Sequence, residues 1–151
     1  MTADTPAPPA ATETLLLRHP AISARHLAFV YAGDLWIADL DGRNARRLTV
    51  PGGSTVAPSF SPDGQFLAYS NSGAGSMDVY VVPVAGGRPR RLTFHPGADL
   101  VRGWTPDGRV LFASSRASMN GRVEQLYTLA PDAGHPEVLP RLCCLNRVGV
   151  G

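Results

Sequence analysis

Short apolar segments that alternate with polar or small positions recur along most of this chain. In the segment Leu27–Tyr31, the large side chains of Leu27, Phe29 and Tyr31 stand at every second position. A period of two residues is typical of a β-strand. No segment keeps the i, i+3, i+4 spacing of an amphipathic helix, and 16 Gly and 14 Pro interrupt the chain every few residues. The pattern predicts many short strands and no long helix.

Three sequence motifs return at one common spacing of 44 residues. These are Asp34-Leu35-Trp36-Ile37 with Asp78-Val79-Tyr80-Val81, Arg47-Leu48-Thr49 with Arg91-Leu92-Thr93, and Ser61-Pro62-Asp63-Gly64 with Thr105-Pro106-Asp107-Gly108. A looser third copy, Gln125-Leu126-Tyr127-Thr128 and Val138-Leu139-Pro140, follows after 47 residues. The three extra residues fall within 115–121, where Asn120-Gly121 predicts a longer hairpin loop.

Each copy predicts the same succession of short strands. The expected strands are 27–31, 35–37, 57–60, 66–70, 79–81, 101–104, 110–114 and 126–128, with a last strand at each Arg-Arg-Leu-Thr or its equivalent. In the Ser/Thr-Pro-Asp-Gly turns, Pro presets φ and Gly supplies the left-handed residue that closes a hairpin. A period in the forties composed only of short strands is typical of β-propeller blades. We therefore expect an all-β chain of about three four-stranded antiparallel blades.

The expected organisation has three parts. Residues 1–14 are rich in Pro, Ala and Thr and are expected to be disordered; residues 15–140 form a partial propeller with blades near 15–53, 54–97 and 98–140; residues 141–151 form an atypical tail. The tail contains Cys143 and Cys144, and it begins where a fourth blade is expected. A frameshift or a misplaced gene end explains such a tail, and an interaction segment is the alternative.

Three blades leave apolar faces and strand edges open at both ends. We expect either a truncated chain, which we favour, or self-association through the open blade edges.

Composition excludes some function classes. Only 17% of the residues are charged and the net charge is +2, which gives no electrostatic footprint of nucleic-acid binding. No apolar run approaches the roughly 20 residues of a membrane span, and no signal-peptide pattern opens the chain. The expected location is the cytoplasm.

A finer resemblance covers about residues 15–140. The segments that carry it are Leu17-Arg18-His19-Pro20-Ala21-Ile22, Gly33-Asp34-Leu35-Trp36, Arg91-Leu92-Thr93-Phe94-His95-Pro96-Gly97, Val101-Arg102-Gly103-Trp104, Leu111-Phe112-Ala113-Ser114-Ser115-Arg116 and Pro136-Glu137-Val138-Leu139-Pro140. The repeats resemble the WD40-like (PD40) repeats of the TolB and tricorn group, and these segments resemble the first propeller of tricorn proteases. The resemblance implies part of a six-bladed, non-catalytic propeller that gates or filters oligopeptides for a cytoplasmic S41-type serine peptidase.

No catalytic, cofactor-binding or metal-binding residue is predicted in this chain. It has no Gly-x-Ser-x-Gly elbow, no His-Glu-x-x-His motif and no dinucleotide fingerprint. The serine nucleophile that the resemblance implies would lie far downstream, so the chain itself is not assigned as an enzyme.

One cluster is a candidate contact for a peptide or a protein partner: Arg88, Arg90 and Arg91. Arginine binds carboxylates through paired hydrogen bonds, so these residues are candidates to hold a peptide C-terminus. The alternative is a solvated strand edge protected by charge. Asp34 and Asp78 are expected to cap nearby backbone N–H groups. Trp36, Tyr80 and Tyr127, which share one repeat position, are expected to pack between blades.

Two other functions stay open. A TolB-like propeller would serve as a protein-binding scaffold, and the propeller of a prolyl-oligopeptidase-type hydrolase would precede a different catalytic domain.

Overall fold

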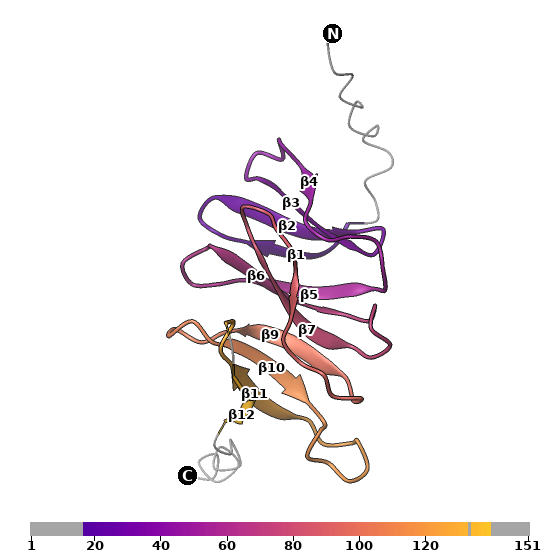
Figure 1. The fold of residues 1–151 in the computed structure, drawn as a ribbon. Coiled ribbons are helices and arrows are strands. Elements are labelled where there is room, and N and C mark those ends of the chain that lie inside the picture. The colour runs from indigo at the N-terminus through magenta and orange to yellow at the C-terminus, as the bar shows by residue number, and fades with distance from the viewer. Residues whose placement is uncertain (1–16, 133, 140–151) are drawn as a thin grey trace, which may run out of the picture.

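The computed structural model describes residues 17–132 and 134–139, which form twelve strands and no helix (Figure 1). The strands form three antiparallel four-stranded sheets, and within each sheet the order in space follows the order in the chain. Blade 1 contains β1 (Arg18–Ile22), β2 (His26–Tyr31), β3 (Asp34–Asp39) and β4 (Arg46–Arg47). Blade 2 contains β5 (Thr55–Phe60), β6 (Phe66–Asn71), β7 (Asp78–Pro83) and β8 (Arg90–Arg91). Blade 3 contains β9 (Asp99–Trp104), β10 (Val110–Ser114), β11 (Gln125–Leu129) and β12 (Glu137–Val138).

The three sheets are stacked in chain order, from indigo to yellow in Figure 1. Their first strands are neighbours, because β5 contacts both β1 and β9. This arrangement, in which sheets fan out from adjacent first strands, is that of propeller blades. The all-β fold class predicted from the sequence is confirmed. The 47-residue spacing is also explained, because the additional residues lie in the long loop between β10 and β11.

The Ser/Thr-Pro-Asp-Gly turns close the hairpins β5–β6 and β9–β10. In the first of them the Gly64 N–H donates to the Ser61 carbonyl at 2.9 Å, and Gly64 has a φ of 72°. The Ser61 hydroxyl donates to Asp63 at 2.6 Å and accepts the Phe66 N–H at 3.0 Å. The left-handed Gly64 is the one that the sequence predicts. The Ser61 and Asp63 side chains, in addition, hold the two strands in register.

Two apolar cores lie between the blades. Blade 1 contributes Ala28, Leu35, Ile37 and Leu48 to the first core, and blade 2 contributes Leu67, Tyr69, Val82 and Val84. The second core contains Ala68, Val79 and Val81 of blade 2 with Val101, Val110, Phe112, Tyr127 and Leu129 of blade 3. A blade thus buries alternate residues of its strands against each neighbour, and burial of one such aliphatic side chain contributes roughly 1.5–3 kcal/mol.

The prediction for the repeated aromatic position is confirmed for Tyr80 and Tyr127. Tyr80 packs against the first core and stacks on Tyr69 with centroids 5.6 Å apart, and Tyr127 lies in the second core. Trp36 lies on the side of blade 1 that faces away from blade 2, where it meets Tyr31 edge-on at 6.2 Å.

Candidate functional site

The repeated Asp and Arg-Leu-Thr motifs form one clasp within each of the first two blades. In blade 2 the Thr93 hydroxyl accepts the Val79 N–H at 2.9 Å and lies 3.4 Å from Asp78. The Asp78 carboxylate is fully buried, and its Oδ2 atom accepts a hydrogen bond from Arg91 Nη2 at 2.8 Å. The Ser76 hydroxyl donates to the same carboxylate at 2.8 Å. The clasp fixes the short outer strand β8 to β7.

Blade 1 repeats this clasp in a more exposed form. The Thr49 hydroxyl accepts the Leu35 N–H at 3.0 Å and lies 3.3 Å from Asp34. Arg47 and Asp34 are 3.5 Å apart, with side chains 44% and 13% exposed. The prediction that Asp34 and Asp78 cap nearby backbone N–H groups is therefore wrong. Their carboxylates bind arginine and threonine side chains, and the threonine caps the backbone.

The first arginine of each Arg-Arg pair reaches the next blade. The Arg46 guanidinium donates to the Val84 carbonyl in blade 2. Arg90, which stands 44 residues later, donates to the Pro131 carbonyl in blade 3 at 3.3 Å and also to the carbonyl of Asp132. In each pair the first arginine therefore binds the neighbouring blade, and the second arginine binds an aspartate of its own blade.

The predicted cluster of three arginines is therefore divided by the fold. Arg91 pairs with Asp78 and lies over the Phe94 ring, 4.6 Å from its centroid. Arg90 is bound to blade 3. Arg90 and Arg91 both border a shallow groove of about 260 Å³. Arg88 is exposed and has no hydrogen bond or ion pair among the described residues. Of the three, Arg88 is the one whose guanidinium remains available to a ligand.

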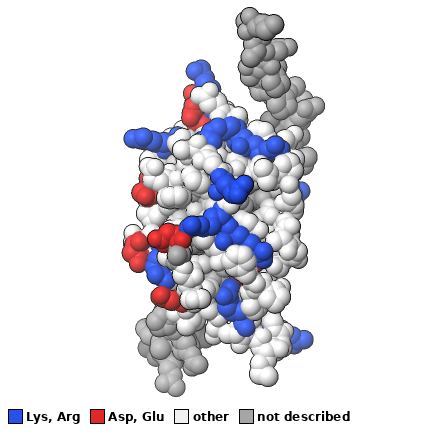
Figure 2. Space-filling model, in the orientation of Figure 1, with Lys and Arg blue, Asp and Glu red and all other residues white. Residues whose placement is uncertain are grey.

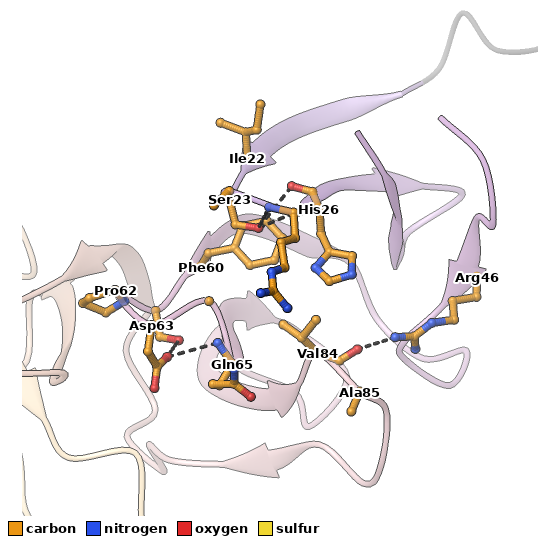
Figure 3. A pocket seen from close by; sticks show the side chains of 14 residues that line it. Ile22, Ser23, His26, Arg46, Phe60, Pro62, Asp63, Gln65, Val84 and Ala85 are labelled. Atoms are coloured by element: carbon orange, nitrogen blue, oxygen red, sulfur yellow. Dashed lines mark hydrogen bonds between the residues drawn. The ribbon is translucent and has the colours of Figure 1, made fainter. Parts of the chain in front are cut away.

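A larger cleft opens between blades 1 and 2, with a volume of about 600 Å³ (Figure 3). One wall is the turn that joins β1 to β2, and the other is the Ser61–Gln65 turn of blade 2. Its principal side chains are Ile22, Ser23, Arg25, His26, Arg46, Phe60, Asp63, Gln65 and Val84. Cavities of 300–1,000 Å³ are typical of sites for small ligands.

The charged groups of the cleft favour an anionic ligand. Arg25 and Arg46 are exposed, and His26 is half-buried; Asp63 is the one acidic residue of the lining. The side-chain hydrogen bond from Ser61, followed by the backbone N–H of Gln65, lowers the pKa of Asp63 below 3.8. Asp63 is thus ionised at neutral pH and bound within its own turn. Arg46 is bound to the Val84 carbonyl, so Arg25 is the arginine of the cleft that is left to meet a ligand.

The turn beside His26 does not form a nucleophile and base pair. The Ser23 hydroxyl accepts the backbone N–H of His26 at 3.0 Å, so it is held by the backbone of its own turn and not by the imidazole. In residues 17–132 and 134–139, no group of three or more His, Cys, Asp or Glu side chains lies close enough to hold a metal ion.

A second buried ion pair, in blade 3, was not predicted. Asp99 is fully buried, and its Oδ2 atom accepts a hydrogen bond from Arg116 Nη2 at 2.6 Å. The Oδ1 atom of Asp99 has no hydrogen-bond partner among the described residues. The Arg116 guanidinium also lies 5.3 Å from the Phe112 ring centroid. The repeat could not indicate this pair, because Arg116 belongs to the segment that lengthens the third copy. The sequence did not indicate the cleft between blades 1 and 2 either.

The charges on the surface are mixed in sign. Figure 2 shows arginine atoms across the middle of one face and acidic atoms along its left side. No described segment forms a helix that is long and apolar enough to span a membrane.

A family model described as the tricorn protease N-terminal beta propeller domain matches residues 14–142. The chain belongs to this family. The family resemblance predicted from the sequence is therefore confirmed. The tail at residues 141–151 and the two cysteines lie outside the described residues.

Known proteins of two kinds are similar to this tricorn-type propeller. A protein named putative tricorn protease homolog 2, from Streptomyces coelicolor, is 48% identical over 56 residues, which are 36% of this chain and 5% of that protein. The Tol-Pal system protein TolB of Desulfosudis oleivorans is 34% identical over 65 residues, covering 40% of this chain and 15% of that protein. The crystal structure of the tricorn protease matches with a TM-score of 0.70 and 26% identity, over 82% of this chain and 13% of that one.

The chain thus spans 5% and 15% of the length of these two relatives. The alignments concern the propeller, and the activity of a whole relative belongs to a much longer protein.

Proposed function

We propose that this chain is the non-catalytic propeller portion of a tricorn-like cytoplasmic serine protease, and that it gates or filters the oligopeptides that the protease degrades. The family match over residues 14–142 supports this function. The arginine-lined cleft between blades 1 and 2 is the observation that carries it, because a peptide has a carboxylate at one end and an extended backbone behind it.

The cleft suits the C-terminal end of a peptide. Arg25 is exposed at the rim, and Arg88 follows the blade 2 turn whose residues Val84 and Ala85 line the opposite side. A guanidinium group and a carboxylate form paired, charge-assisted hydrogen bonds. Phe60 supplies apolar surface beneath a peptide side chain. We propose that Arg25 and Arg88 bind the peptide carboxylate, and that Arg90 and Arg91 position the blade around it.

Fluorescence anisotropy with short labelled peptides tests this function. Saturable binding that is stronger for free C-terminal carboxylates than for amidated peptides is expected. The variants Arg25→Gln and Arg88→Gln should each weaken binding by at least about tenfold, which is the lower limit for one charge-assisted hydrogen bond of roughly 1.5–3 kcal/mol. Arg43→Gln is the matched control, because Arg43 is an exposed arginine in a blade 1 turn outside the cleft. Equal binding of free and amidated peptides would contradict the proposed role of the carboxylate.

A TolB-like scaffold is the second candidate, and the 34% identity with TolB favours it. Exposed apolar side chains such as Phe94, which is 72% exposed, suit contact with a folded protein. A scaffold would bind a folded partner through such a surface and would leave short peptides unbound. The anisotropy titration therefore separates the two functions.

A further inference from the structure

The contact between two neighbouring blades, which we call a joint, contains a cavity in both places where the chain makes it. The cleft lies at the joint of blades 1 and 2. A second cavity of about 320 Å³, the inter-turn groove, lies between residues 61–63 of blade 2 and residues 106–108 of blade 3. Phe60 lines the cleft, and Trp104, which stands 44 residues later, lines the inter-turn groove. The two cavities therefore occupy the same place in the repeat.

Most of the inter-turn groove is apolar. Its apolar lining consists of Pro62, Phe66, Trp104, Pro106 and Pro131. Phe66 is 37% exposed, and Trp104 is half-buried. The Trp104 indole N–H donates to the Ser59 carbonyl of blade 2 at 2.9 Å, which fixes the ring across the joint. The groove thus offers a rigid aromatic wall to a ligand.

The two cavities differ in charge. The cleft contains Arg25, Arg46 and His26 beside Asp63. The inter-turn groove contains the carboxylates of Asp63 and Asp107, and none of the described residues that line it is basic. Asp63 belongs to both linings, so the cavities adjoin at the blade 2 turn. One repeat has therefore produced a cationic cavity and an anionic one side by side.

The carboxylates of the inter-turn groove are not neutralised within the chain. Other aspartates pair with arginines, namely Asp34, Asp78 and Asp99. Among the described residues, no ion pair joins Asp63 or Asp107 to a basic side chain. Arg109, which follows the blade 3 turn, pairs with Glu137 at 3.2 Å instead. A cation in the groove would therefore displace no ion pair of the fold.

The turns hold these carboxylates in the ionised form. The Ser61 hydroxyl lowers the pKa of Asp63, and the Thr105 hydroxyl lowers the pKa of Asp107. Asp63 binds its own turn through Oδ1 (Figure 3). Its Oδ2 atom accepts no hydrogen bond from the described residues, so this oxygen is left for a ligand.

We propose that the inter-turn groove binds an arginine side chain of an extended peptide, with the guanidinium beside Asp63 and Asp107 and against Trp104. Charge complementarity selects a cation, and the aromatic wall selects a planar one. A guanidinium group stacks on aromatic rings and binds carboxylates through paired hydrogen bonds, whereas an ammonium group is a compact, strongly hydrated charge. The inference rests on the proposed peptide function and adds to it a preference for arginine.

Fluorescence anisotropy with capped peptides tests this preference on the purified 151-residue chain. The probes are short peptides, labelled at the N-terminus and amidated at the C-terminus, that contain arginine, lysine or citrulline at one position. Capping removes both terminal charges, so a carboxylate site in the cleft does not contribute. The arginine peptide should bind at least about tenfold more tightly than the citrulline peptide, which has the same shape without the charge.

The lysine peptide should bind more weakly than the arginine peptide. Equal affinities of the arginine and citrulline peptides overturn the proposal. Tighter binding of lysine than of arginine overturns the assignment of the side chain.

The variant Asp107→Asn separates the groove from the cleft, because Asp107 lines the groove and not the cleft. It should weaken binding of the arginine peptide by at least about tenfold and leave the citrulline peptide unaffected. Asp41→Asn is the matched control, because Asp41 is an exposed turn aspartate that lines neither cavity. Unaltered binding of the arginine peptide to Asp107→Asn overturns the proposal.

The tryptophan indole N–H signals in nuclear magnetic resonance spectra locate the bound side chain. The chain has two tryptophans, Trp36 and Trp104, and the variant Trp36→Phe assigns their signals. The arginine peptide should shift the Trp104 signal and leave that of Trp36 in place, because Trp36 does not line the groove. A shift of Trp36 alone, or of neither signal, overturns the proposed site.

Failure of this inference differs from failure of the proposed function. Binding that prefers free C-terminal carboxylates but does not distinguish arginine from citrulline overturns the groove and leaves the peptide function. Tight binding of the capped arginine peptide, without any preference for free carboxylates, supports the groove and contradicts the proposed role of Arg25 and Arg88.

Discussion

The two Asp–Arg clasps occupy the same repeat position but differ in burial, so they predict different costs for the same substitution. Arg91→Gln leaves the fully buried Asp78 carboxylate without its cation. Removing one partner of a buried pair costs about 3–5 kcal/mol, and the partial exposure of Arg91, 29%, places the value near the lower limit. Arg47→Gln removes a pair that is 44% exposed on the arginine side, which is worth at most about 1 kcal/mol.

Urea and thermal unfolding, followed by circular dichroism, measure both variants. For a chain of this size about 1 kcal/mol shifts Tm by roughly 2–4 °C. Arg91→Gln should therefore lower Tm by roughly 6–12 °C, and Arg47→Gln by less than about 4 °C. The double variant Asp78→Asn with Arg91→Gln should lose less than the sum of the single losses, because it leaves no buried charge. Equal losses for Arg91→Gln and Arg47→Gln would refute the argument from burial.

Three further measurements follow from the turns and the joints. Gly42→Ala should cost roughly 1–2 kcal/mol, which is the cost of a left-handed non-glycine residue, because Gly42 has a φ of 83° and open space around it. Gly53→Ala should destabilise the chain by several times that amount, because its Cβ would also lie 2.2 Å from the backbone nitrogen of Gly73. Ser61→Ala removes the hydrogen bond that lowers the pKa of Asp63. A carboxylate with a lowered pKa stabilises the fold only while it is ionised. The difference in Tm between the wild type and Ser61→Ala should therefore be constant well above pH 3.8 and should shrink as the pH falls below it. Arg90→Gln should lower the free energy of unfolding by about 1.5–3 kcal/mol, measured as a lower urea midpoint. An unchanged midpoint would show that the contact of blade 2 with blade 3 does not need this arginine.

Local signals in the sequence were sufficient for most of the strands. Alternation and turn residues placed β10 at 110–114 and the Gly64 turn correctly, because both depend on neighbours in the chain. The strand β1 was not delimited, since its Arg18–Ile22 segment has no clear alternation. A bulge between Arg18 and Ala21 explains that irregularity.

The side chains of the candidate site were less predictable than the strands. Arg90 and Arg91 are identical residues at adjacent positions, and only the strand register decides which of them faces the next blade. The cleft depends on the distance between two turns that lie about 40 residues apart in the chain. Such distances are properties of the stacked blades, and a single repeat does not contain them.

Hydrogen–deuterium exchange, with and without a mixture of short peptides that have free C-terminal carboxylates, tests the proposed gate most directly. A propeller that admits oligopeptides should show peptide-dependent protection in the β1–β2 turn and in the Ser61–Gln65 turn, which form the two walls of the cleft. The outer strand β12, which lies outside the cleft, should exchange at an unchanged rate. Unchanged exchange throughout the described residues at saturating peptide would contradict the account, and so would protection confined to β12.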